Sequence, residues 1–132
     1  MAVDRHVQAR PRNWLVPVAL VTLQEENSYG YELMERVKEF GFEQINPGNL
    51  YRTLRRMENE GLCRSAWETQ QGGPARRVYA ITAYGESSLK LWAEGLKRYR
   101  EVMESFFRAY RGRADRASSE GGASSSGSDA GS

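Results

Sequence analysis

The best-marked helix in this sequence is NPGNLYRTLRRMENEG, residues 46–61. Asn46 is a favoured N-cap residue, Pro47 suits the first helical position, and Gly61 is typical of the position just past a helix end. Three apolar residues of this stretch fall on one face at helical spacing: Leu50, Leu54 and Met57. The opposite side carries polar and basic residues, namely Asn49, Arg52, Arg55, Arg56 and Asn59. The pattern predicts an amphipathic helix with a basic outer face.

A helix that recognises DNA needs one apolar and one basic face. The apolar face packs on its own core, while the other offers hydrogen-bond donors to base edges and phosphates. Arg52, Arg55 and Arg56 are suited to guanine edges or to phosphates. An ordinary surface helix with arginines for solubility is the alternative. Glu58 and Glu60 fit neither interpretation well, but they lie at the end of the helix away from Pro47.

Two further helices are expected before residue 46. Residues 13–24 are apolar nearly all round, which favours a mostly buried helix, with a strand as the alternative because of the valines. The regular part should begin close to Pro17, since proline is tolerated only in the first turn. A second helix is expected from an N-cap at Ser28 to Gly41, with its apolar residues on one stripe.

A β-hairpin is expected next, because residues 62–69 and 76–81 are rich in strand-forming residues and flank a Gly72-Gly73-Pro74 turn. Arg76 and Arg77 begin its second strand, where they suit contacts with the DNA backbone or the minor groove. A plain solvent-exposed hairpin is the alternative. Because the basic helix and the basic hairpin are consecutive, together they favour a DNA-binding unit.

A last helix is predicted over residues 83–112, with Thr82 as its cap. Apolar residues recur along it at alternating spacings of three and four, which is a heptad seam. The first helix is too short to cover this seam, so we expect it to form a homodimer interface rather than to fold back on its own chain. The predicted dimerisation residues are Leu89, Trp92, Leu96, Tyr99, Met103, Phe106 and Tyr110.

The composition argues against a metal site, a cofactor and an enzymatic function. The chain has one cysteine and one histidine, so neither an internal disulfide nor a Cys/His metal site is expected, and no cofactor is expected. No arrangement of nucleophile, base or paired carboxylates suggests an enzyme. All 19 basic residues precede residue 117, against 15 acidic ones there, a modest positive excess that permits a polyanionic partner.

The chain is expected to be cytoplasmic without a membrane partner, because residues 1–13 lack the apolar core of a signal peptide and the longest apolar run, residues 15–23, is too short to span a bilayer. The predicted fold is mainly α, a winged helix-turn-helix of three helices and a β-hairpin wing with a long C-terminal dimerisation helix. The expected parts are a flexible arm over 1–12, the winged helix over 13–82, the dimerisation helix over 83–112 and a disordered Ser/Gly-rich tail over 113–132.

Four short motifs, taken in this order, resemble the PadR family of transcriptional regulators. They are NSYGYEL at 27–33, NPGNLYRTLRRME at 46–58, Gly61-Leu62, and GPARRVYAIT at 73–82 followed by Gly85. The branch suggested is that of polyhydroxybutyrate-responsive repressors. The resemblance implies a winged helix, a dimer and palindromic operators. It also implies that Tyr51 and Arg52 contact DNA and that Arg76 and Arg77 contact its backbone.

The sequence therefore predicts a sequence-specific regulator that binds double-stranded DNA as a dimeric repressor. A winged-helix module for protein–protein interaction without DNA binding is the alternative. Some members of the resembled family bind aromatic ligands between protomers, and Trp92 occupies a comparable place. A small aromatic or planar effector is therefore considered, with Trp92, Leu96 and Trp14 as its site, although Trp92 would also serve simply to fill the core.

Overall fold

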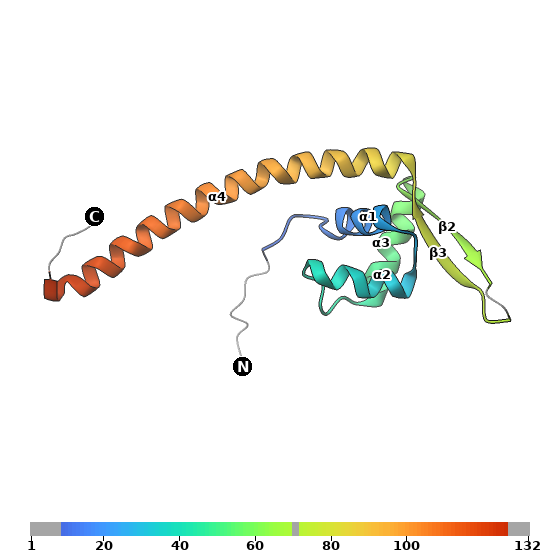
Figure 1. Cartoon of the computed structure of the whole chain (residues 1–132), viewed down its shortest axis with the longest axis horizontal. Coiled ribbons are helices and arrows are strands. Elements are labelled where there is room, and N and C mark those ends of the chain that lie inside the picture. Colours follow the sequence, from blue (N-terminus) through green and yellow to red (C-terminus); the bar gives the residue numbers. More distant parts are fainter. Residues whose placement is uncertain (1–8, 70–71, 127–132) are drawn as a thin grey trace. The chain divides into compact units, whose positions relative to one another are not determined.

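A computed structural model describes residues 9–69 and 72–126 of the chain, with side-chain surroundings as far as 118. Its elements are α1 (Leu15–Glu25), β1 (Ser28–Tyr29), α2 (Gly30–Arg36), the 3-10 helix η1 (Val37–Phe40), α3 (Pro47–Asn59), β2 (Cys63–Glu68), β3 (Arg76–Ile81) and α4 (Ala83–Ser126) (Figure 1). The chain forms two compact units, one ending at Trp92 and the other beginning at Ala93. The mainly α winged-helix fold is confirmed.

The three predicted helices supply most of the hydrophobic core of the first unit, to which the hairpin and the start of α4 add Cys63, Tyr79 and Leu89. Leu20 and Leu23 of α1, Leu33 of α2, and Leu50 and Leu54 of α3 are almost completely buried in it. Burying an aliphatic side chain of this size contributes roughly 1.5–3 kcal/mol, so the apolar stripes read from the sequence account for the packing. Residues 15–25 form a helix and not a strand, with Pro17 in its first turn.

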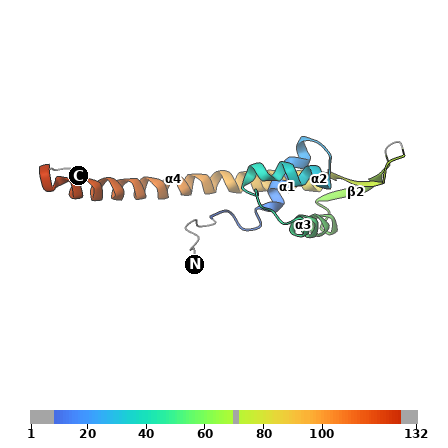
Figure 2. The same cartoon turned by 90° about the horizontal axis from the view of Figure 1, so that it is seen from below.

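The limits of α3 agree with its predicted caps. The Asn46 side chain accepts a hydrogen bond from the Gly48 backbone N–H at 2.6 Å. Gly61, just past the helix, has a φ of 81°, a left-handed conformation that costs glycine little. Gly41 likewise has a φ of 93° after η1. α3 lies beside the hairpin strand β2 (Figure 2).

The sheet has three antiparallel strands in the order β1-β3-β2. β2 and β3 pair from Cys63 opposite Ile81 to Glu68 opposite Arg76, which confirms the predicted hairpin, called the wing below. The two-residue strand β1 was not predicted. Ser28, expected as a helix cap, pairs instead with Tyr79, and α2 starts after Tyr29. A strand this short carries no periodicity, so its pairing depends on where β3 lies.

α4 begins as predicted, with the Thr82 hydroxyl accepting a hydrogen bond from the Gly85 N–H at 2.9 Å. It continues to Ser126, beyond the predicted end at residue 112. Residues 113–126, expected to be disordered, are therefore helical, and 127–132 lie outside the described residues. Extending an existing helix adds a hydrogen bond per residue without a new nucleation step, and no proline interrupts this segment.

The end of the predicted N-terminal arm is attached to the fold. The Arg10 guanidinium lies 4.5 Å from the centre of the Phe42 ring and donates a hydrogen bond to the Gly41 carbonyl at 2.9 Å. Residues 1–8 lie outside the described part of the chain. Arg10 thus belongs to the turn between η1 and α3 rather than to a free arm.

Candidate DNA-binding surface

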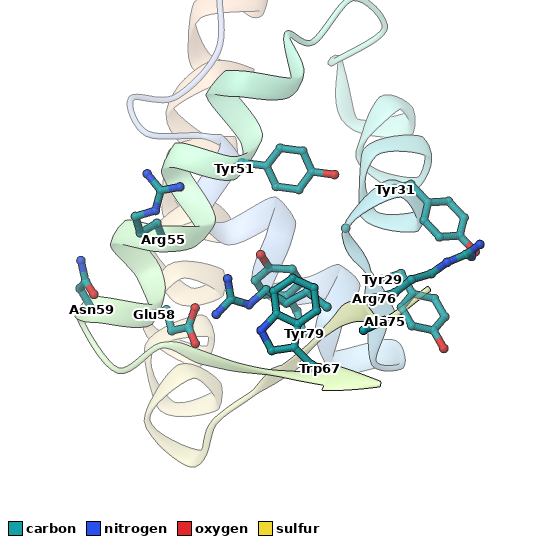
Figure 3. A pocket seen from close by; sticks show the side chains of 12 residues that line it. Tyr29, Tyr31, Tyr51, Arg55, Glu58, Asn59, Trp67, Ala75, Arg76 and Tyr79 are labelled. Atoms are coloured by element: carbon teal, nitrogen blue, oxygen red, sulfur yellow. The ribbon is translucent and has the colours of Figure 1, made fainter. Parts of the chain in front are cut away.

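A hollow of about 710 Å³ lies between the start of α2, the exposed face of α3 and the wing (Figure 3). Several of the residues that line it are aromatic, and three are arginines. Its lining consists of Tyr29, Gly30, Tyr31, Tyr51, Arg55, Glu58, Asn59, Trp67, Ala75, Arg76, Arg77 and Tyr79. The lining of the hollow therefore comes from segments that are far apart in the sequence.

The predicted DNA-binding residues of α3 are all exposed, whereas Leu50, Leu54 and Met57 on the other side of the helix are buried. Only Tyr51 and Arg55 of this set line the hollow. The Arg52 side chain donates to the amide oxygen of Asn49. Arg56 lies 4.0 Å from Glu60 in an exposed pair, which contributes little to stability and leaves the arginine accessible.

The two predicted wing arginines are both held by aromatic rings. The Arg76 guanidinium lies 5.5 Å from the centre of the Tyr31 ring, and its Nη1 donates to the Tyr31 hydroxyl at 3.3 Å. The Arg77 guanidinium lies 5.1 Å from the centre of the Trp67 ring, its partner across the hairpin. Cation–π contacts of this kind restrict where each positive charge lies.

Two acidic residues beside the wing, Glu58 and Glu68, have structural partners. The Glu58 carboxylate accepts hydrogen bonds from the Ser65 N–H at 3.1 Å and from the Ser65 hydroxyl at 2.7 Å, so it joins α3 to β2. Glu68 accepts a hydrogen bond from the Tyr29 hydroxyl at 2.8 Å. That hydrogen bond is the main cause that raises the pKa of Tyr29. Glu58, which fitted no sequence-based interpretation, therefore helps to fix the wing against α3.

Four aromatic members of the hollow were missed in the sequence, whereas Tyr51 was predicted as a DNA-binding residue. Trp67 had a partial signal, since it lies in the predicted first strand, but the register that places it opposite Arg77 comes from the structure. Tyr31 had no such signal, since it lies 45 positions from Arg76 and on another element. Tyr79 is buried on β3, and burial is the first cause that raises its pKa.

The residues of the predicted seam have two different surroundings. Leu89 is buried in the core of the first unit, and Trp92 packs partly buried against the same core. In the second unit Leu96 is half-buried, while Tyr99, Met103, Phe106 and Tyr110 are exposed. Val102 and Phe107, which were not in the predicted set, are exposed as well. The exposed apolar face of α4 thus starts later than the sequence pattern and is wider.

Two of the three residues considered for an effector pack on different core clusters of the first unit. Trp92 packs on the main core cluster, whereas Trp14 packs on a second cluster that contains Val18, Val37 and Phe42. The Trp14 indole also donates to the Phe40 carbonyl at 2.9 Å. Leu96 belongs to the second unit.

Within residues 9–69 and 72–126, no group of three or more His, Cys, Asp or Glu side chains is arranged to hold a metal ion. No helix in that part of the chain is long and apolar enough to cross a membrane. Cys63 is buried, which raises its thiol pKa to about 11.

Residues 19–91 match the family model described as "Transcriptional regulator PadR-like family". A protein of Mycobacterium tuberculosis described as a probable transcriptional regulator is 41% identical over 75 residues, 55% of this chain. The chain matches 40% of the length of that relative.

Solved structures of two such regulators resemble the chain in fold. A PadR-like transcriptional regulator of Bacillus cereus is 26% identical with a TM-score of 0.66, over 73% of this chain and 93% of that one. A PadR family regulator of Clostridium difficile is 27% identical with a TM-score of 0.65, over 71% and 98% of the two chains.

Proposed function

This chain belongs to the PadR-like family of transcriptional regulators, and we propose that it acts as a homodimeric repressor on a palindromic operator. One observation supports DNA binding above the others. α3 buries one face completely and leaves Arg52, Arg55 and Arg56 accessible on the other, while Arg76 and Arg77 of the wing line the hollow beside it. This arrangement suits a helix in the major groove and a wing on the backbone.

The roles of the basic residues follow from their places. Arg52 and Arg55 lie one helical turn apart on α3, and we assign them to base edges, where arginine bridges the two acceptors of guanine. Tyr51, Asn49 and Arg56 share the exposed side and are assigned to base edges or phosphates. Arg76 and Arg77 are assigned to phosphates, because a hairpin beside a recognition helix meets the backbone.

The proposed dimer rests on the exposed part of α4. Between Tyr99 and Tyr110 the helix exposes six large apolar side chains, of which Phe106 is 61% and Tyr110 62% exposed. Apolar residues at heptad spacing pair with a second helix of the same kind. A two-fold dimer would present two copies of α3 to half-sites about one DNA turn apart.

Fluorescence anisotropy on duplexes from the region upstream of the gene, against random duplexes, tests the proposal. Arg52→Ala and Arg55→Ala should each weaken operator binding by roughly 1–3 kcal/mol and leave random DNA little affected. Lys90→Ala, which removes a positive charge on α4 outside the hollow, is the control. Equal losses on both duplexes would remove the base-edge assignment. Failure of the wild-type protein to bind any duplex would favour the protein–protein interaction module.

Repression of transcription and release of the protein from DNA by an effector are tested by separate experiments. A reporter gene behind the operator should be expressed less in the presence of the protein; increased expression would mean activation. We also propose that a small aromatic or planar effector binds near Trp92, which is partly buried on the core. Such a ligand should quench tryptophan fluorescence and weaken operator binding, and Trp92→Phe should abolish the quenching. Quenching that persists in Trp92→Phe would place the ligand elsewhere.

A further inference from the structure

The wing is attached to the start of α2 by side chains from four separate positions. Tyr29 and Tyr31 stack with their ring centres 5.8 Å apart and their planes within 5° of parallel. Glu68, the last residue of β2, accepts the hydrogen bond of the Tyr29 hydroxyl, while Arg76, the first residue of β3, lies over Tyr31. The stacked tyrosines therefore contact both strands of the wing.

Glu68 and Arg76 are partners in the register of the hairpin. Each of them contacts one of the two stacked rings, so both strands of the wing are held, at their turn ends, against the segment that leads from β1 into α2. Figure 3 shows Arg76 and Tyr31 pointing toward one another at the edge of the hollow. Tyr31 is 53% exposed, so its contribution to the core is small and its visible role is this contact.

A guanidinium on an aromatic face keeps its N–H groups available at its edge for a phosphate, because the ring interacts with its flat side. An unrestrained arginine loses side-chain entropy when it binds, and a restrained one loses less. An aromatic ring under a phosphate-binding arginine therefore raises affinity without touching DNA.

We propose that Tyr31 is a positioning residue for DNA binding, which holds the Arg76 guanidinium at the turn end of the wing strands for a backbone phosphate at the hollow. This inference rests on the proposed function, and it adds a residue outside the recognition helix and the wing. Trp67 stands in the same relation to Arg77 within the hairpin.

A double-mutant cycle on duplex binding tests the inference. A cation–π contact is worth about 0.5–2 kcal/mol, so Tyr31→Ala should weaken binding to operator and random duplexes alike by roughly 2- to 30-fold. Arg76→Ala should weaken binding at least as much and lower the salt slope by about 0.9, whereas Tyr31→Ala should leave that slope unchanged. The double variant should bind no more weakly than Arg76→Ala alone.

Tyr31→Phe separates the ring from its hydroxyl. It retains the stacking surface, so it should bind almost as well as the wild type. Tyr84→Ala is the matched control, since Tyr84 is 61% exposed on α4 and does not line the hollow. All variants should keep the thermal midpoint of the wild type, because neither tyrosine is buried.

Three results would overturn the inference while leaving the proposed function intact. They are additive losses in the double variant, a Tyr31→Phe protein as weak as Tyr31→Ala, and a salt slope that falls in Tyr31→Ala. The second would mean that the hydroxyl, which accepts a hydrogen bond from Arg76, acts rather than the ring, and the third that the Arg76–phosphate contact itself is lost without Tyr31. If the wild-type protein bound no duplex, the proposed function would fail first.

Discussion

The ring of Tyr51 lies against the backbone of Gly30, so closely that a Cβ on Gly30 would be 2.7 Å from Tyr51 Cε1 and 2.9 Å from the hydroxyl oxygen. The lack of a side chain at the start of α2 therefore makes room for an exposed tyrosine of α3. The contact joins the two helices of the helix-turn-helix at the wall of the hollow.

Gly30→Ala should displace the Tyr51 ring without unfolding the protein. The ring is 39% exposed and has solvent to turn into, so the thermal midpoint should change little. Operator affinity should fall by about 1 kcal/mol, the typical contribution of one hydrogen bond, and Tyr51→Ala should lose a similar amount. Anisotropy titrations measure both losses. Unchanged affinity in Gly30→Ala would show that the position of Tyr51 does not matter for DNA binding.

Gly85→Ala should destabilise the protein. A Cβ there would be 2.1 Å from the Leu62 carbonyl oxygen, which is backbone and does not move easily. Overpacking of this kind costs about 1–3 kcal/mol, and each kcal/mol lowers the thermal midpoint by roughly 4–8 °C in a domain of this size. Gly112→Ala is the control, because the nearest atom to a Cβ there is the flexible end of the Arg116 side chain at 3.8 Å. Equal thermal midpoints for the two variants in circular dichroism melts would contradict the predicted overpacking at Gly85.

Leu89 and Phe106 should behave differently although both belong to the same heptad pattern. Leu89→Ala removes a buried core side chain and should cost about 2–5 kcal/mol of stability. Phe106→Asp places a charge on the exposed apolar face and should yield monomers that remain folded. Light scattering after gel filtration, together with thermal melts, separates the two effects. A wild-type monomer at tens of micromolar would rule out the proposed dimer.

The free energy of unfolding should decrease at alkaline pH because of Cys63. Burial raises the thiol pKa from 9.0 to about 11 in the folded protein, so the unfolded chain loses this proton at lower pH. The stabilisation is complete below pH 9 and is lost as the pH rises to about 11, with a slope below about 1.4 kcal/mol per pH unit.

Urea midpoints measured between pH 8 and about 11 test this prediction. Cys63→Ala should show a shallower decline than the wild type over that range. Some decline should remain, because burial also raises the pKa of Tyr79. Identical slopes in the two proteins would mean that Cys63 does not contribute.

Local features of the fold could be predicted from the sequence because they depend on neighbouring residues. The limits of α3 follow from Asn46, Pro47 and Gly61, and its two faces follow from the 3.6-residue period. The hairpin follows from a glycine turn between two runs of strand-forming residues. These patterns also identified the exposed arginines of α3 and the wing, since one amphipathic helix and one hairpin suffice to place them on a surface.

Only the tertiary structure decided which of these local elements meet. The strand β1 exists because Ser28 lies beside Tyr79, and Leu89 belongs to the core rather than to the exposed seam because the start of α4 packs there. Tyr31 reaches Arg76 across 45 positions of sequence. Such contacts have no period and no short-range signal, because they depend on the path of the whole chain and on which apolar faces it must bury together.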